Sequence, residues 1–208
     1  MKKILLLFLT VLIGVFQTFS QEKIKLKGVL MTNDYHKKIT WVKSKPTPLV
    51  KKDFTVGANS VKNIQIYFGA KMEDGKQIIM PIRLVNNYFD TSWIFFDEVS
   101  YLLGSRKEIR QGKGVVFKIK DKETTRNTIG VEVHEQSDIE AIGEAKEFIK
   151  YVLENEETGL IVRYIDNDKG QYVDVKVPKG TKKLKKHFIA LVESYNKLCE
   201  LSKLEQRF

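Results

Sequence analysis

The chain contains little cysteine and little proline. Its 208 residues include four prolines and one cysteine, Cys199. A single cysteine excludes a disulfide within the chain, and so few prolines exclude a proline-rich stalk. Cys199 lies on the apolar face of a predicted C-terminal helix. We therefore expect a buried, inert thiol, with an intermolecular bridge as the alternative.

Motifs of common catalytic and metal sites are also missing. No Gly-x-Ser-x-Gly nucleophile elbow occurs, and Gly112 and Gly114 flank a turn between strands rather than a phosphate-binding loop before a helix. His134 precedes Glu135 but lacks the second histidine of a zinc-protease motif. The chain therefore predicts no metal, no cofactor and no identifiable catalytic residue. Its histidines are scattered: His36, His134 and His187.

The overall composition is that of a globular protein with an excess of positive charge. Hydrophobic residues make up 42% and charged residues 30%, which excludes a wholly disordered, collagenous or membrane-spanning chain. The 36 basic and 26 acidic residues give a net charge of +10. Such a balance favours acidic partners.

The first 20 residues have the layout of a secretory signal peptide. Lys2 and Lys3 precede the apolar run 4–16, and small residues stand at Thr18 and Ser20 before a cut ahead of Gln21. A helix over that run would be about 20 Å long, short of the ~30 Å hydrocarbon core. No cysteine lies at the cut, so a lipoprotein is not expected. We expect a bacterial protein exported to the periplasm or cell exterior, without a transmembrane segment after cleavage.

The remaining chain divides into an extension and a domain. Residues 21–56 form an irregular N-terminal extension with strands predicted at 23–27 and 39–43, followed by a Lys- and Pro-rich connection at 43–52. Residues 57–208 form the predicted domain.

Strand patterns dominate the first half of that domain. Asp74-Gly75 predicts a tight turn, and Pro81 predicts an edge strand or a bulge. In 129–135, Ile129, Val131 and Val133 alternate with polar residues and are assigned to one face. The predicted strands are 64–68, 77–85, 93–96, 99–103, 115–120 and 129–135.

The period then changes to that of helices. Ser137 and Glu140 predict a capping box at the start of the first helix, which ends before Gly159. A hairpin of strands 160–165 and 171–177 follows, and Thr181 begins a second helix. The apolar positions of the first helix are Ile142, Ala145, Ile149 and Val152. Those of the second are Leu184, Phe188, Leu191, Tyr195 and Leu198.

This order predicts an α+β fold. We expect an antiparallel sheet of six to eight strands with two amphipathic helices packed on one face, in the order strands, helix, β-hairpin, helix. A β-sandwich with C-terminal helices is the alternative.

Lysines crowd the start of the second helix, where the helix dipole already carries positive potential. Each exposed lysine there costs a few tenths of a kcal/mol, so helix stability does not explain the placement, whereas an anionic ligand would. The alternative is a solubilising surface. The candidate binding residues are Lys179, Lys182, Lys183, Lys185 and Lys186. Two further basic clusters are Lys43, Lys45, Lys51 and Lys52, and Arg106, Lys107, Arg110 and Lys113.

These features favour a non-catalytic binding or structural module with a basic surface for an acidic envelope component, glycan or protein. Nucleic acid is not expected, because the lysine clusters contain few aromatic residues for base stacking. A carboxylate-dependent hydrolase using Asp97 and Glu98 is one alternative. The other is a carrier of an apolar ligand lined by Trp93, Phe95, Phe96, Tyr101 and Phe117.

Overall fold

The computed structural model describes residues 26–49 and 62–203. The predicted signal peptide, residues 1–20, lies outside this part of the chain, as do most of the predicted strand 23–27 and both Lys51 and Lys52 of the second basic cluster.

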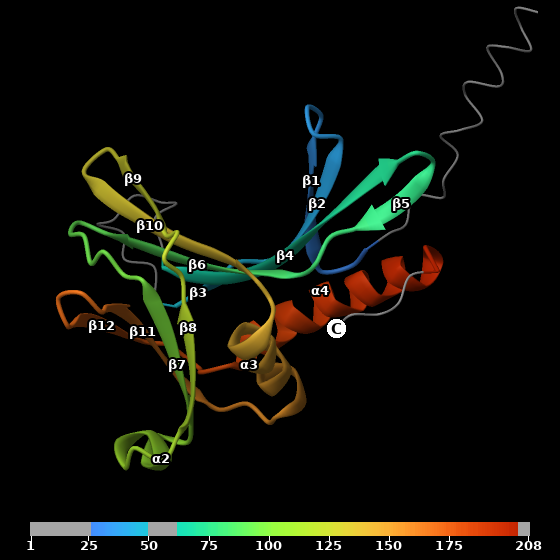
Figure 1. Cartoon of the computed structure of the whole chain (residues 1–208). Coiled ribbons are helices and arrows are strands. Elements are labelled where there is room, and N and C mark those ends of the chain that lie inside the picture. Colours follow the sequence, from blue (N-terminus) through green and yellow to red (C-terminus); the bar gives the residue numbers. More distant parts are fainter. Residues whose placement is uncertain (1–25, 50–61, 204–208) are drawn as a thin grey trace, which may run out of the picture.

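The described residues form antiparallel strands and three helices (Figure 1). The strands are β1 (Val29–Asp34), β2 (Ile39–Ser44), β3 (Thr47–Pro48), β4 (Asn63–Glu73), β5 (Lys76–Ile79), β6 (Arg83–Asp90), β7 (Glu98–Gly104), β8 (Val115–Lys120), β9 (Thr125–Ile129), β10 (Glu132–Glu140), β11 (Gly159–Asp166) and β12 (Gln171–Lys176). The helices are α2 (Arg106–Arg110), α3 (Gly143–Glu154) and α4 (Lys182–Leu201).

The strands belong to two sheets. Sheet A has eight strands in the order β1-β2-β4-β6-β10-β9, with β3 and β5 also paired to β4, and sheet B has the order β12-β11-β7-β8. The α+β class and the order of strands, helix, hairpin and helix are confirmed, with the short α2 added. The expectation of one sheet is wrong. After β6 the chain leaves sheet A to form β7 and β8, then returns as β9. A short turn in the sequence indicates that the two strands it connects pair with each other. It does not indicate which sheet that pair joins.

The turn and the irregularity predicted around β5 are confirmed. Asp74 and Gly75 have φ values of 49° and 74° and join β4 to β5 as a two-residue hairpin turn. Beyond β5, residues 80–82 lie opposite residues 68–69 of β4, because Ala70 pairs with Ile79 and Tyr67 with Arg83. One extra residue on one strand is a β-bulge, and Pro81 lies within it.

Two strand predictions are wrong. Residues 93–96 form a loop, and 129–135 is interrupted by a hairpin turn in which Gly130 has a φ of 63°. The turn reverses the chain between β9 and β10, so Ile129 is 54% and Val131 87% exposed. The alternation of the sequence therefore did not continue along a single strand.

The predicted start of the first helix is also wrong. Ser137 lies in β10, paired with Asn86 of β6, and α3 begins six residues later at Gly143. Ile142 is the N-cap and is exposed, because it precedes the first helical turn. Strand pairing with β6 thus prevails over the capping-box pattern. The other three predicted apolar positions of this helix are buried.

The second helix follows its prediction. Thr181 is the N-cap of α4, and all five predicted apolar positions are buried. Cys199 is buried as well.

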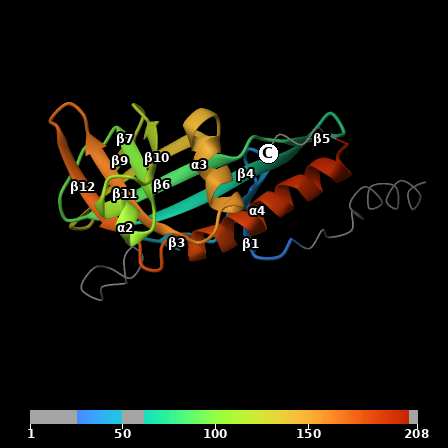
Figure 2. The ribbon, with the colours of Figure 1, turned by 90° about the horizontal axis from the view of Figure 1, so that it is seen from below.

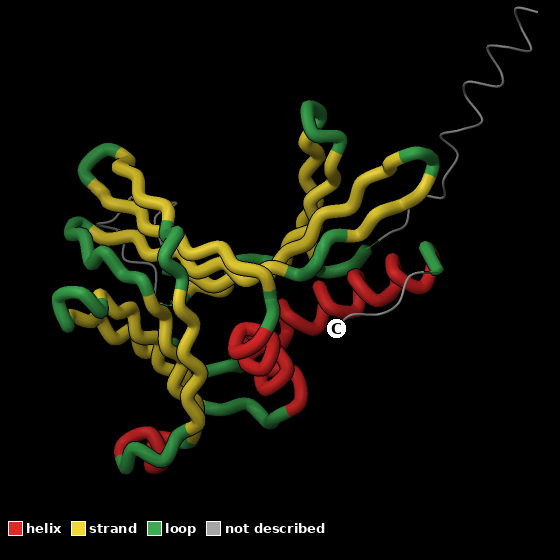
Figure 3. The backbone as a smooth tube through the Cα atoms, viewed as in Figure 1, coloured by secondary structure: helices red, strands yellow, loops and turns green. Residues whose placement is uncertain are grey.

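Helix α4 lies along one face of sheet A, and α3 lies beside sheet B (Figure 2). Helix α4 contacts β1 to β4, and α3 contacts β8 and α4. The ring of Phe148 on α3 stacks on Tyr101 of β7 with centroids 3.8 Å apart and meets Phe188 of α4 edge-on at 6.2 Å. This aromatic contact joins sheet B to both helices. Figure 3 shows the strands of sheet A above α3 and α4, and the strands of sheet B beside α3.

A buried carboxylate fastens sheet A to the loop that leads into sheet B. Glu135 of β10 is 0% exposed. Its Oε1 accepts hydrogen bonds from the backbone N–H groups of Ile94 (2.7 Å) and Phe95 (3.0 Å), and its Oε2 from that of Phe96 (3.1 Å). Arg126 Nε lies 3.3 Å from Oε2. Phe95 has a φ of 58°, which turns successive N–H groups towards one anion.

We expect Glu135→Gln to lower the free energy of unfolding by about 1–3 kcal/mol, because the amide brings an N–H₂ donor towards backbone donors and leaves at least one unsatisfied. Urea denaturation measures this change. Glu123→Gln, at an exposed turn position, is the matched control and should stay within ~0.5 kcal/mol of the wild type. Equal stability of Glu135→Gln and wild type would contradict this role.

Candidate functional site

The five predicted lysines lie around the start of α4, and their contacts differ. Lys182 Nζ lies 3.5 Å from Glu157 Oε2, and Lys185 Nζ donates a hydrogen bond of 2.7 Å to the carbonyl oxygen of Asn155. These two lysines hold the loop between α3 and β11. Lys179 lies in the turn before the helix with a φ of 63°.

Lys183 and Lys186 lie near His187 and act on it through their charges. The Nδ1 atom of His187 is 2.8 Å from Thr47 Oγ1 in β3. Burial lowers the pKa of His187 below its usual 6.5, and the positive charges of Lys183, Lys45 and Lys186 lower it further, against an opposing hydrogen bond with the Lys45 backbone. The structure thus brings Lys45 of the second cluster to this side of α4.

On the other side, Lys179 contributes to a basic pocket of about 560 Å³. The pocket lies between α2, the start of β11 and the connection from β12 to α4. Arg106 and Arg110 reach it from α2, and Lys176 from the end of β12. One carboxylate, Glu157, also lines it. We call this site the basic pocket.

Local sequence explains how α2 presents its arginines. Ser105 Oγ accepts from the Glu108 N–H at 3.2 Å and Glu108 Oε2 from the Ser105 N–H at 2.7 Å, which is a capping box. Arg106 and Arg110 are four residues apart, so they share one face of the helix.

Gly180 allows two backbone segments to lie in contact at the bottom of the basic pocket. A Cβ atom on Gly180 would stand 1.8 Å from the carbonyl oxygen of Thr158, so only glycine permits this approach. Thr181 N–H donates to that oxygen at 2.9 Å, and Thr181 Oγ1 accepts from the Thr158 N–H at 2.9 Å. The hydroxyl oxygen Oγ1 of Thr158 is buried without a hydrogen-bond partner.

The arrangement suits an anionic group rich in oxygen. Four exposed cations face one carboxylate, and guanidinium groups bind phosphate, sulfate or carboxylate through paired N–H donors. Within residues 26–49 and 62–203, no group of three histidine, cysteine, aspartate or glutamate side chains is placed to hold a metal ion.

The residues of the carrier hypothesis mostly pack against other side chains. Phe96 and Tyr101 are fully buried, and Phe96 lies 5.0 Å from the ring of Tyr164. Trp93 stacks on the half-exposed Phe95 at 5.6 Å. None of the five, including Phe117, lines the basic pocket or either of two smaller pockets, one beside β8 and α3 and one on sheet A.

The two carboxylates of the hydrolase hypothesis do not line these pockets either. Asp97 Oδ1 accepts hydrogen bonds from the backbone (3.1 Å) and side-chain (2.8 Å) N–H groups of Asn167. Glu98 is buried at the start of β7.

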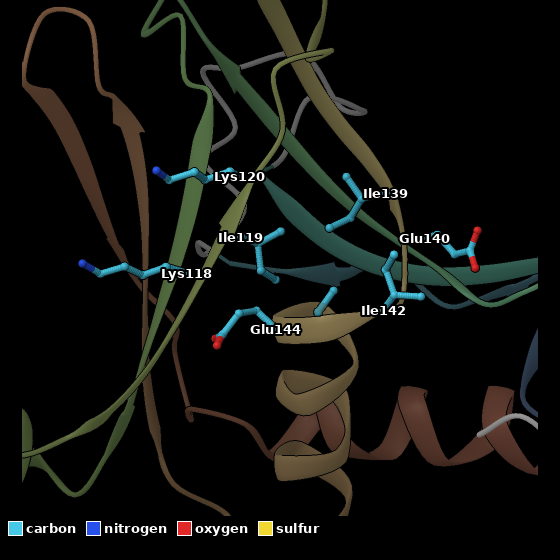
Figure 4. Close-up of a pocket in the computed structure, with 8 residues that line it drawn as sticks. Lys118, Ile119, Lys120, Ile139, Glu140, Ile142 and Glu144 are labelled. Atoms are coloured by element: carbon cyan, nitrogen blue, oxygen red, sulfur yellow. The ribbon is translucent and has the colours of Figure 1, made fainter.

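Two further pockets were not anticipated. One, of about 310 Å³, lies between β8, the end of β10 and the start of α3. Figure 4 shows Ile119 and Ile139 facing its interior, while Lys118 and Lys120 point away. The other, of about 410 Å³, is on the face of sheet A away from the helices. Their residues come from strands distant in sequence, so no local motif marks them.

Lys176 was also missed by the sequence analysis, although it precedes the Pro178–Gly180 turn that brings the chain to the pocket. Arg106 and Arg110 were recognised only as a separate cluster. Helix α2, which follows β7, and the end of β12 lie close together because β11 pairs with both β7 and β12.

Comparison with known proteins adds no functional information. No protein-family model, no curated protein and no solved structure matches the chain. Among the helices of the described ranges, none is long and apolar enough to span a membrane.

We expect NMR titration to give His187 a pKa below 6.5, and the double variant Lys183→Gln/Lys186→Gln to raise it, because two nearby positive charges are removed. A lowered histidine pKa means that the unfolded chain binds protons first, so this group reduces stability as pH falls through about 6.5.

His134 is the internal control, since burial alone lowers its pKa. An unchanged His187 pKa in the double variant, or an equal change at His134, would contradict the assigned cause.

Proposed function

We propose that the protein is a non-catalytic binding module that holds an acidic group of its partner in the basic pocket. The supporting observation is that the fold brings cations of two sequence clusters, Arg106 and Arg110 with Lys179, to one pocket, together with Lys176. We further propose that the chain is exported, as its first 20 residues predict, and that the partner is an acidic envelope glycan or protein.

Electrostatics favour this assignment over a diffuse basic surface. The lining side chains carry four positive charges and one negative charge. Gly180 and Thr181 lead directly into α4, a helix of 20 residues, so the positive end of its dipole lies beside the pocket. Lys182 and Lys185, by contrast, already have acceptors in the α3–β11 loop.

The residues that line the basic pocket are suited to binding rather than to catalysis. It includes no histidine, no cysteine and only one carboxylate, whereas acid–base catalysis usually pairs two titratable groups of different pKa. The groups present can orient an anion and neutralise it.

Charge reversal in the basic pocket tests the proposal. Arg110→Glu/Lys179→Glu should weaken binding to immobilised dextran sulfate by about tenfold or more, equivalent to at least ~1.4 kcal/mol. Binding of the wild type should also decrease between about 0.05 and 0.2 M salt. Neutral dextran controls for the polysaccharide backbone.

The matched control is Lys183→Glu/Lys186→Glu, which reverses the same number of charges on the His187 side of α4. It should weaken binding by less than about threefold, because these charges lie outside the pocket lining. Equal losses in the two variants would show that general charge, and not the pocket, determines binding.

A further inference from the structure

The face of sheet A that the helices leave uncovered carries a second pocket. Its residues come from β2, β4, β6, β10 and the segment between β5 and β6, and its volume is about 410 Å³. Figure 1 shows the β1–β2 and β4–β5 hairpins projecting on this side, opposite α3 and α4. We call it the sheet pocket.

Strand register places aromatic and charged side chains side by side on this face of sheet A. Lys43, Tyr67, Arg83 and Glu140 are successive Cα partners across four strands. Residues paired across antiparallel strands point to the same face, where their side chains interact.

Hydrogen bonds fix the polar part of the sheet pocket. Asp138 Oδ1 accepts from Arg83 Nε at 2.7 Å and its Oδ2 from the Tyr67 hydroxyl at 2.7 Å. Arg83 Nη2 donates to the Asp138 carbonyl oxygen at 2.6 Å. Burial and the Asp138 carboxylate raise the pKa of Tyr67 to about 12, so its hydroxyl stays a donor.

These groups retain capacity for a ligand. A guanidinium has five N–H donors, and a carboxylate has about four acceptor positions. Arg83 uses two donors in the bonds to Asp138 and Asp138 uses one position on each carboxylate oxygen. Donors and acceptors therefore remain next to each other.

An aromatic surface forms the rest of the sheet pocket. The half-buried Trp41 lies edge-to-face with Tyr67, with ring centroids 5.5 Å apart. A Cβ atom on Gly69 would stand 2.6 Å from Met80 Sδ and 2.9 Å from Trp41 Cζ3. The glycine therefore lets the indole ring lie close to the β4 backbone.

Charged side chains of both signs line the sheet pocket, namely Arg83, Asp138 and the exposed Glu140. Arg83 pairs with Asp138. This ion pair is neutral as a whole, so it gives little advantage to an anion or a cation. An apolar ligand would bury the remaining donors and acceptors without partners, which is unfavourable.

We propose that the sheet pocket binds a neutral sugar ring of a glycan. The C–H face of the ring packs on Trp41, and its hydroxyl groups, each both a donor and an acceptor, pair with Arg83 and Asp138. This site is separate from the basic pocket and does not depend on the function proposed for it.

The chain has two tryptophans, Trp41 and Trp93, so Trp93→Phe makes Trp41 the single fluorescent reporter. This variant is titrated with five neutral oligosaccharide series, namely cello-, malto-, manno-, xylo- and chito-oligosaccharides. The oligosaccharide concentration should reach ~10 mM, at which a site with a Kd of ~1 mM is about 90% occupied. We expect a saturable change in Trp41 emission with at least one series, unaffected by salt between about 0.05 and 0.2 M. No change with any of the five would overturn the proposal.

Calorimetry with the oligosaccharide that binds then tests the residues. Trp41→Ala should weaken binding by about tenfold or more, because a packed aromatic ring commonly dominates a small site, while Trp93→Phe should bind as the wild type. Arg83→Lys keeps the charge but loses the planar donor pattern, and should also weaken binding if Trp41→Ala fails to fold. Wild-type affinity in a folded Trp41→Ala or Arg83→Lys protein would refute the site.

Discussion

The placement of sheet B against sheet A depends on the buried carboxylate of Glu135. The loop it binds carries the chain from one sheet to the other, and β7 starts directly after that loop. Asp97, the last loop residue, donates its N–H to Ile165 at 2.9 Å and accepts from the Asp121 N–H at 2.7 Å. The loop therefore sets the alignment of β8 and β11, the two neighbours of β7, and with them the position of α2, which connects β7 to β8.

The basic pocket is a product of this arrangement. Its cations come from α2, which follows β7, from the end of β12, which pairs with β11, and from the turn between β12 and α4. The lysines at the start of α4 divide between roles: Lys182 and Lys185 hold a loop, while Lys183 and Lys186 surround His187. Contacts within the protein therefore offset part of the free-energy cost of placing lysines at a helix start. Of the five lysines, only Lys179 lines the basic pocket.

Local sequence patterns predicted those elements whose stability is itself local. The apolar stripe of α4, the Asp74-Gly75 turn and the irregularity at Pro81 follow from one segment each. The patterns failed where distant pairing decided the outcome. Ser137 has the spacing of a helix cap, yet Asn86 of β6 holds it in a strand. Glu135 stands in a polar–apolar alternation, yet the 93–96 loop buries it.

The basic pocket and the sheet pocket were harder still to predict, because neither corresponds to a contiguous motif. Arg110 and Lys179 are far apart in sequence, as are Trp41 and Asp138, and only the order of strands in the two sheets brings each pair together. Composition indicated an acidic partner, but it contained no sign of the sheet pocket, with Trp41 beside the Arg83–Asp138 pair.

The most direct test of the account is a map of backbone amide chemical shifts during titration with inorganic pyrophosphate at constant ionic strength. We expect saturable shifts centred on Thr158, Gly159 and Gly180, whose backbone lines the basic pocket. Shifts centred on Lys183 and Lys186, or spread evenly over the exposed lysines, would contradict the claim that the pocket is the anion-binding site.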